Sequence, residues 1–151
     1  MSRSLRPSPC LLLLAVLPSA CVGIGLAEDV TIRLINAKNG QPLEGQVIVL
    51  HLGDASRAST PRVETTTSSD GTATFHLPEP LPEEVFLDTE NGKIRACYSW
   101  GAFSTREVIK HGVVAENKCD PKGKLKGKFT AKPGEVIVFV RSLKWWERMQ
   151  T

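Results

Sequence analysis

The three histidines, His51, His76 and His111, are the side chains of this 151-residue sequence best suited to acid–base chemistry near neutral pH. His51 and His76 fall in predicted strands, and His111 falls at the end of a predicted short helix, where a positive charge suits the helix dipole. Each position has a structural explanation, and no Gly-x-Ser-x-Gly, His-Glu-x-x-His or phosphate-loop motif is present, so we expect no catalytic residue. The alternative is a small hydrolase or isomerase using a loop histidine, which requires two histidines to meet a carboxylate in one pocket.

The N-terminus has the three zones of a secretory signal over residues 1–27. After two arginines, residues 10–17 form an apolar core and residues 25–27 a small-x-small cleavage site. The core ends at Pro18 and is shorter than the roughly 20 residues of a spanning helix, so we expect no transmembrane segment in the mature chain. The sequence predicts a secreted or periplasmic protein, with a lipoprotein anchored through Cys21 as the alternative.

Two cysteines, Cys97 and Cys119, remain once the predicted signal is removed. Alternation along a strand places Cys97 with Arg95, opposite the face of Ile94. If Ile94 faces the core, the thiol of Cys97 points outward, towards an insertion that ends near Cys119. We therefore predict a Cys97–Cys119 disulfide that pins this insertion over the outside of a sheet. Two cysteines without a nearby histidine pair do not supply four zinc ligands, so we expect no metal and no cofactor.

The overall charge gives no reason to expect a nucleic-acid partner. It is +3 for the whole chain and falls to +1 when the two arginines of residues 1–27 leave, because no acidic residue leaves with them. One segment, Lys118–Lys132, is locally basic, with lysines at 118, 122, 124, 126, 128 and 132. It is either a solvated loop and edge strand or a contact for an acidic polymer or phospholipid surface. Lys122, Lys124 and Lys126 are the candidates for such a contact.

Alternating apolar residues predict the strands that must position these side chains. The predicted strands lie near residues 30–34, 47–50, 62–67, 72–77, 85–88, 93–100, 125–130 and 135–141. The second is apolar on both faces, which favours a central position, and the third is polar, which favours an edge. Val30, Ile32 and Leu34 share one face of the first strand. Asp70-Gly71 predicts a hairpin turn into the fourth, in which Ala73, Phe75 and Leu77 face inward. The set indicates an all-β protein, a seven- to eight-stranded antiparallel sandwich that forms a single domain over residues 28–151.

One short helix, near Thr105 to His111, interrupts the predicted strands. Ser104 and Glu107 have the spacing of a capping box, and Gly112 follows as a left-handed cap. The helix lies in an insertion between two strands.

The segments Asn39-Gly40-Gln41-Pro42-Leu43-Glu44-Gly45 and residues 67–78, which read T-x-S-D-G-x-A-x-F-x-L-P, resemble the carboxypeptidase regulatory-like domains. The resemblance covers chiefly residues 29–77. It implies a transthyretin-like (prealbumin-like) or Ig-like Greek-key sandwich that acts as a structural, adhesive or docking module, including in bacterial envelope proteins. The fold also includes hydroxyisourate hydrolase, but the Tyr-Arg-Gly-Ser ending of that enzyme is replaced here by Glu147-Arg148-Met149-Gln150-Thr151.

The C-terminal end carries two adjacent tryptophans, Trp145 and Trp146, after Ser142, which could cap a final helical turn. We expect Trp146 to pack on the sandwich and Trp145 to be exposed, available to bind a partner, a sugar ring or a membrane interface. The resulting hypothesis is a non-enzymatic binding module that recognises a protein or envelope polymer through its loops and this end. A hydrolase of the same fold using loop histidines is the alternative, and a structural subunit of an envelope assembly is the third possibility.

Overall fold

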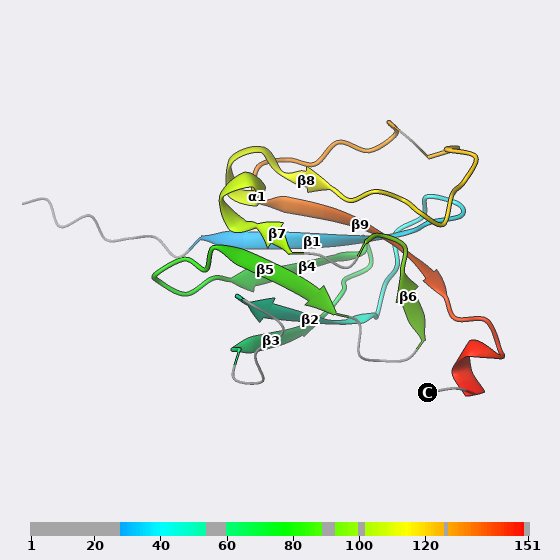
Figure 1. Ribbon diagram of the computed structural model, residues 1–151, viewed down its shortest axis with the longest axis horizontal. Coiled ribbons are helices and arrows are strands. Elements are labelled where there is room, and N and C mark those ends of the chain that lie inside the picture. Colours follow the sequence, from blue (N-terminus) through cyan, green and yellow to red (C-terminus); the bar gives the residue numbers. More distant parts are fainter. Residues whose placement is uncertain (1–27, 54–59, 89–92, 100–101, 126, 150–151) are drawn as a thin grey trace, which may run out of the picture.

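The fold consists of two β-sheets packed face to face, seen in the computed structural model in Figure 1. The structure describes residues 28–53, 60–88, 93–99, 102–125 and 127–149. The predicted signal, with Cys21, lies outside these residues. The elements are β1 (Asp29–Asn36), β2 (Val47–Leu52), β3 (Arg62–Thr66), β4 (Thr72–His76), β5 (Glu84–Asp88), β6 (Ile94–Ala96), β7 (Phe103–Ser104), α1 (Thr105–His111), β8 (Val113–Val114), β9 (Glu135–Ser142) and a 3-10 turn, η1 (Glu147–Met149).

One sheet has the order β4-β1-β9-β6, with β8 also paired to β9, and the other has the order β3-β2-β5-β7. The all-β prediction with one short helix is confirmed, as are the interior position of β2 and the edge position of β3. The prediction of an antiparallel sandwich is wrong at β9, which runs parallel to both β1 and β8. Alternation of apolar and polar residues shows which face of a sheet a side chain lies on. The alternation is the same in parallel and antiparallel strands, so it could not predict the direction of β9.

The turn at Asp70-Gly71 connects the two sheets and is not the predicted hairpin, since β3 pairs with β2 whereas β4 pairs with β1. The turn is still tight: the amide of Ser68 donates to the carbonyl of Thr72 at 2.9 Å. Gly71 has φ +76°, and a Cβ there would lie 2.8 Å from the carbonyl oxygen of Leu34 on β1. Glycine is required because the turn approaches β1 this closely.

Two predicted strands change in the structure. The strand predicted at 93–100 is reduced to β6, and Trp100 lies outside the described residues. The strand predicted at 125–130 is wrong, because its described residues form turns and irregular chain. Lysine alternates with glycine or leucine in this part of the sequence, and this alternation of residue types led to the wrong prediction of a strand. Gly123 and Gly127 adopt φ of +61° and +73°, which a strand excludes.

The inner core fills the space between the two sheets. It contains the alternate residues predicted to face inward from the first and fourth strands, together with residues of β2, β5 and β9: Val30, Ile32, Leu34, Ile48, Leu50, Ala73, Phe75, Leu77, Val85, Leu87, Val136, Val138 and Val140. Burial of this continuous apolar surface is the main term that stabilises the sandwich.

A second apolar cluster, here called the outer cluster, lies on the opposite face of β1 and β9. Its buried members are Ile35, Ala37, Cys97, Leu125, Ile137 and Phe139, with Cys119, Phe129 and Ala131 packed against them. Residues 116–125 and 127–131, here called the cover, lie over this face. β9 is therefore buried on both sides from Glu135 to Val140.

The predicted cysteine pair joins the cover to the sheet. Cys97 faces outward from the inner core, as predicted, and lies at disulfide distance from Cys119, with an S–S distance of 2.06 Å. The amide of Lys118 donates to the carbonyl of Cys97 at 2.6 Å, so a backbone bond accompanies the covalent one.

Helix α1 has the predicted bounds, but its N-terminus is not closed by a capping box, because Ser104 makes no side-chain cap bond. Ser104 instead pairs with Glu84 as part of β7. Burial of Val108 in the inner core holds the helix. Gly112 ends it with φ +71° and ψ 159°, so φ is positive but the predicted left-handed cap conformation is not adopted, and its amide donates to the carbonyl of Val108 at 2.9 Å. Within the described ranges, no helix is long and apolar enough to span a bilayer.

Candidate functional site

The histidines lie on different surfaces of the sandwich. His51 follows Leu50, which faces the inner core, so its side chain points out of the β2 sheet. His76 lies between inward-facing Phe75 and Leu77 and therefore points out of the other sheet. The outer faces of two packed sheets point in opposite directions, so these two rings cannot meet.

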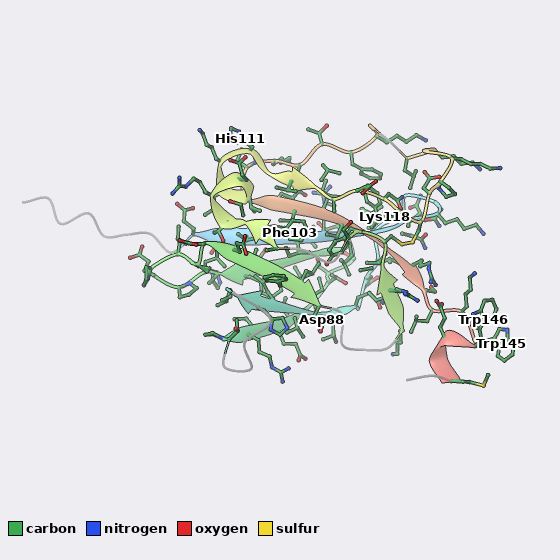
Figure 2. All side chains as sticks on the ribbon, in the orientation of Figure 1. Asp88, Phe103, His111, Lys118, Trp145 and Trp146 are labelled. Carbon is green, nitrogen blue, oxygen red and sulfur yellow. A yellow bond between two sulfur atoms is a disulfide. The ribbon has the colours of Figure 1, made fainter. Side chains whose placement is uncertain are left out.

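Several other titratable groups have partners that stabilise the fold. His76 Nδ1 lies 2.5 Å from Asp29 Oδ1 as an exposed pair, and His111 is exposed at the end of α1 (Figure 2). The buried carboxylate of Glu135 is paired with Arg33 Nη2 at 2.7 Å. The single tyrosine, Tyr98, donates its hydroxyl to the carbonyl of Leu87 at 3.1 Å, and burial raises its pKa. The geometry assembles no acid–base pair in a pocket from these groups.

The C-terminal turn, residues 143–149, presents the most exposed large apolar side chains in the described part of the chain. Trp145 is 69% exposed, Trp146 46% and Met149 70%. The two indole rings are perpendicular, with centroids 5.8 Å apart, and Figure 2 shows both beyond the end of the sheets. The prediction that Trp145 is exposed is confirmed. The prediction that Trp146 packs on the sandwich is wrong.

The reason for this exposure is the place where the turn begins. The sequence placed Ser142 at the start of a final helical turn, but Ser142 ends β9 and the 3-10 turn begins at Glu147. The chain from Leu143 to Trp146 therefore leaves the sheet as an irregular segment, which takes both tryptophans away from the core. Only Leu143 remains half-buried, and its amide donates to the carbonyl of Lys93 at 2.9 Å.

Glu147 fastens this turn to the sheet. Its carboxylate accepts two bonds from the guanidinium of Arg141, at 2.6 and 2.7 Å, and one from Arg95 Nη1 at 3.0 Å. It also accepts the amide of Lys144 at 2.8 Å. The hydrogen bonds from Arg141 first, and that from Lys144 next, hold the pKa of Glu147 well below its usual 4.5. The same pairing raises the pKa of Arg141.

The two arginines explain why the chain turns back. Arg95 on β6 and Arg141 on β9 are direct register partners, and like charges placed opposite each other on neighbouring strands repel. The carboxylate of Glu147 lies between them and neutralises this repulsion. A bidentate bond to Arg141 also fixes the direction of the turn. The tryptophans are consequently displayed from a fixed position.

The lysines predicted to bind a partner are not brought together with the tryptophans. Lys122 and Lys124 are exposed on the cover, and Lys126 lies outside the described residues. Figure 2 shows Lys118, at the start of the basic segment, well apart from Trp145 and Trp146. The sequence therefore contains two separate candidate surfaces, and the structure does not join them.

A cavity of about 780 Å³ lies where the cover meets the sheet, and sequence reasoning did not find it. Leu125, Phe129 and Phe139 line it together with Lys118, Lys122 and Asp120. Its rim carries both signs of charge, and the carboxylate of Asp120 already accepts the amide of Leu125 at 2.8 Å. The only sequence signal was Phe129, the single aromatic residue among the lysines. Because its lining is partly apolar and carries both signs of charge, the cavity does not indicate one class of ligand.

A second cavity, of about 680 Å³, lies beside α1 and is lined by Leu81, Glu84, Arg106 and Ile109, among others. Neither cavity has a histidine in its lining. Within the described ranges, no group of three or more His, Cys, Asp or Glu side chains could hold a metal ion.

Comparison with known proteins gave no relative for this chain: no family model, curated protein or solved structure matches it significantly.

Proposed function

We propose that this chain is a secreted or periplasmic, non-enzymatic binding module, a transthyretin-like or carboxypeptidase regulatory-like sandwich whose C-terminal turn binds a component of the cell envelope. The observation that carries the proposal is the exposure of Trp145 and Trp146 on a turn that Glu147 fixes to the sheet. Exposed tryptophans are unfavourable in an isolated protein and are enriched at binding surfaces.

The turn is already ordered in the unbound protein, and this lowers the entropic cost of binding. Ordering a flexible tail on binding costs conformational entropy. Here the bonds from Arg141, Arg95 and Lys144 to Glu147 order the backbone before any partner arrives.

The predicted export is supported by the Cys97–Cys119 pair, because disulfides persist in oxidising compartments. The two sheets share one inner core, so the sandwich can serve as a rigid scaffold that holds this turn in position.

The proposal is tested by sedimenting the purified chain, from residue 28 onward, with a washed bacterial envelope fraction. We expect the wild-type protein to sediment with the envelope and the Trp145→Ala variant to lose most of this binding. Leu81→Ala is the matched control, since Leu81 is 42% exposed at a distant loop. Equal binding of all three proteins, or no binding of the wild type, would overturn the proposal.

A further inference from the structure

The C-terminal turn carries a chemical combination that identifies one kind of partner. Trp145, Trp146 and Met149 are its exposed apolar side chains, and Lys144 Nζ lies 4.9 Å from the centre of the Trp146 ring. From Arg141 to the end of the sequence the basic residues are Arg141, Lys144 and Arg148, and the single acidic residue is Glu147. The carboxylate of Glu147 is already bonded to arginine.

Resting on the proposed function, we propose that the partner of this turn is an anionic phospholipid surface. Tryptophan prefers the boundary between lipid headgroups and acyl chains, where its ring is buried and its N–H remains hydrated. Lysine and arginine near that boundary are attracted to anionic headgroups. The turn presents both residue types on one short segment.

The size of the patch favours a bilayer over a folded protein partner. A stable protein interface buries about 800 Å² on each side, and 20 to 30 residues take part. The turn offers three apolar side chains, and none of them lines either of the two cavities described above. A bilayer needs no such area, because side chains at a protruding tip can enter it to a depth of about 5–10 Å.

The location of the turn permits this contact. Figure 1 shows the turn after β9 at the extremity of the sandwich, and in Figure 2 the two indole rings extend beyond the ribbon. The sheets therefore do not obstruct a flat surface approaching Trp145 and Trp146.

The test uses the purified chain from residue 28 onward, which carries the whole described fold and lacks the apolar residues 10–17. Binding is measured by sedimentation with protein-free vesicles of phosphatidylcholine alone or with phosphatidylglycerol. We expect binding to the anionic vesicles that weakens with added salt, and much weaker binding to phosphatidylcholine. Trp145→Ala should weaken binding at least about tenfold, since it removes a large side chain from the lipid boundary. Leu81→Ala should bind as the wild type does.

Absence of binding to anionic vesicles, or equal binding of wild type and Trp145→Ala, would overturn the lipid assignment. If the wild type then still binds the envelope fraction through Trp145, the partner is a protein or polymer and the proposed function stands. If Trp145 affects neither assay, both proposals are wrong. Urea unfolding of each variant, with midpoints equal to that of the wild type, excludes loss of folding as the cause.

Discussion

Removing the disulfide tests whether the cover is fastened to the sheet as the structure indicates. The change is the double substitution Cys97→Ala and Cys119→Ala. Alanine leaves no unpaired thiol, and Cys97 is buried, so a polar replacement there would add its own cost. The two cysteines are 22 residues apart in the sequence.

The expected loss follows from this separation. In the chain-entropy model, a cross-link over such a distance stabilises the folded state by about 3 kcal/mol. Part of the outer cluster would also become easier to open, because Leu125 and Phe129 would be held over Ile137 and Phe139 only by packing and backbone bonds. A domain of this size is stable by about 5 to 15 kcal/mol, so the variant should still fold.

Equilibrium unfolding in urea measures this loss, with and without a reductant. We expect the reductant to lower the stability of the wild-type protein by about 3 kcal/mol and to leave the variant unchanged. The oxidised wild type should contain no free thiol by mass spectrometry. A variant within about 1 kcal/mol of the oxidised wild type, or two free thiols in the purified protein, would refute the disulfide and the role assigned to it.

Three further substitutions test other parts of the structure. Gly112→Ala should lower the free energy of unfolding in urea by about 3 kcal/mol, because its Cβ would lie 2.1 Å from the carbonyl oxygen of Lys132. The control Gly45→Ala, at a similar positive φ but with no atom beyond its chain neighbours within 4 Å of its Cβ, should lower it by about 1 kcal/mol. Equal losses of stability would contradict the contact at Gly112. The pKa of Glu147 is lowered on folding, so its stabilisation should be complete above about pH 5, begin to fall below its usual 4.5 and be lost as the pH approaches the lowered pKa. The urea midpoints of wild type and Glu147→Gln should therefore draw together in acid, and a gap unchanged down to about pH 2 would contradict this. Trp146→Ala should cost only about 1 kcal/mol, since the ring is half exposed, and a loss of 3 kcal/mol or more would mean that the ring is buried in solution.

Alternation of apolar residues was sufficient to predict most of the inner core. Val30 and Ile32 on β1, and Ala73 and Phe75 on β4, are buried as expected. The pattern is reliable there because one-residue shifts would place apolar side chains in water. The same reasoning placed Cys97 on the outer face, which led directly to the predicted pair with Cys119.

The parts that could not be predicted depend on contacts between distant residues. The parallel pairing of β1 and β9 leaves the same alternation as an antiparallel pairing, so the sequence pattern does not distinguish them. The bond between Arg95 and Glu147 joins residues 52 positions apart, and together with the bidentate bond from Arg141 it holds the C-terminal turn in place. The sequence analysis could not include that bond, so it relied on helical spacing and wrongly predicted that Trp146 packs on the sandwich.

β9 connects the two features that set this sandwich apart. Its middle, at Ile137 and Phe139, holds the cover through the outer cluster, and its end, at Arg141, holds the C-terminal turn through Glu147. The strand is buried on both faces from Glu135 to Val140, and the side chains that hold the cover are different from those that hold the turn. Stability and binding therefore depend on different side chains: loss of the disulfide should weaken the fold and leave the turn in place, whereas loss of Trp145 should remove binding from an intact fold.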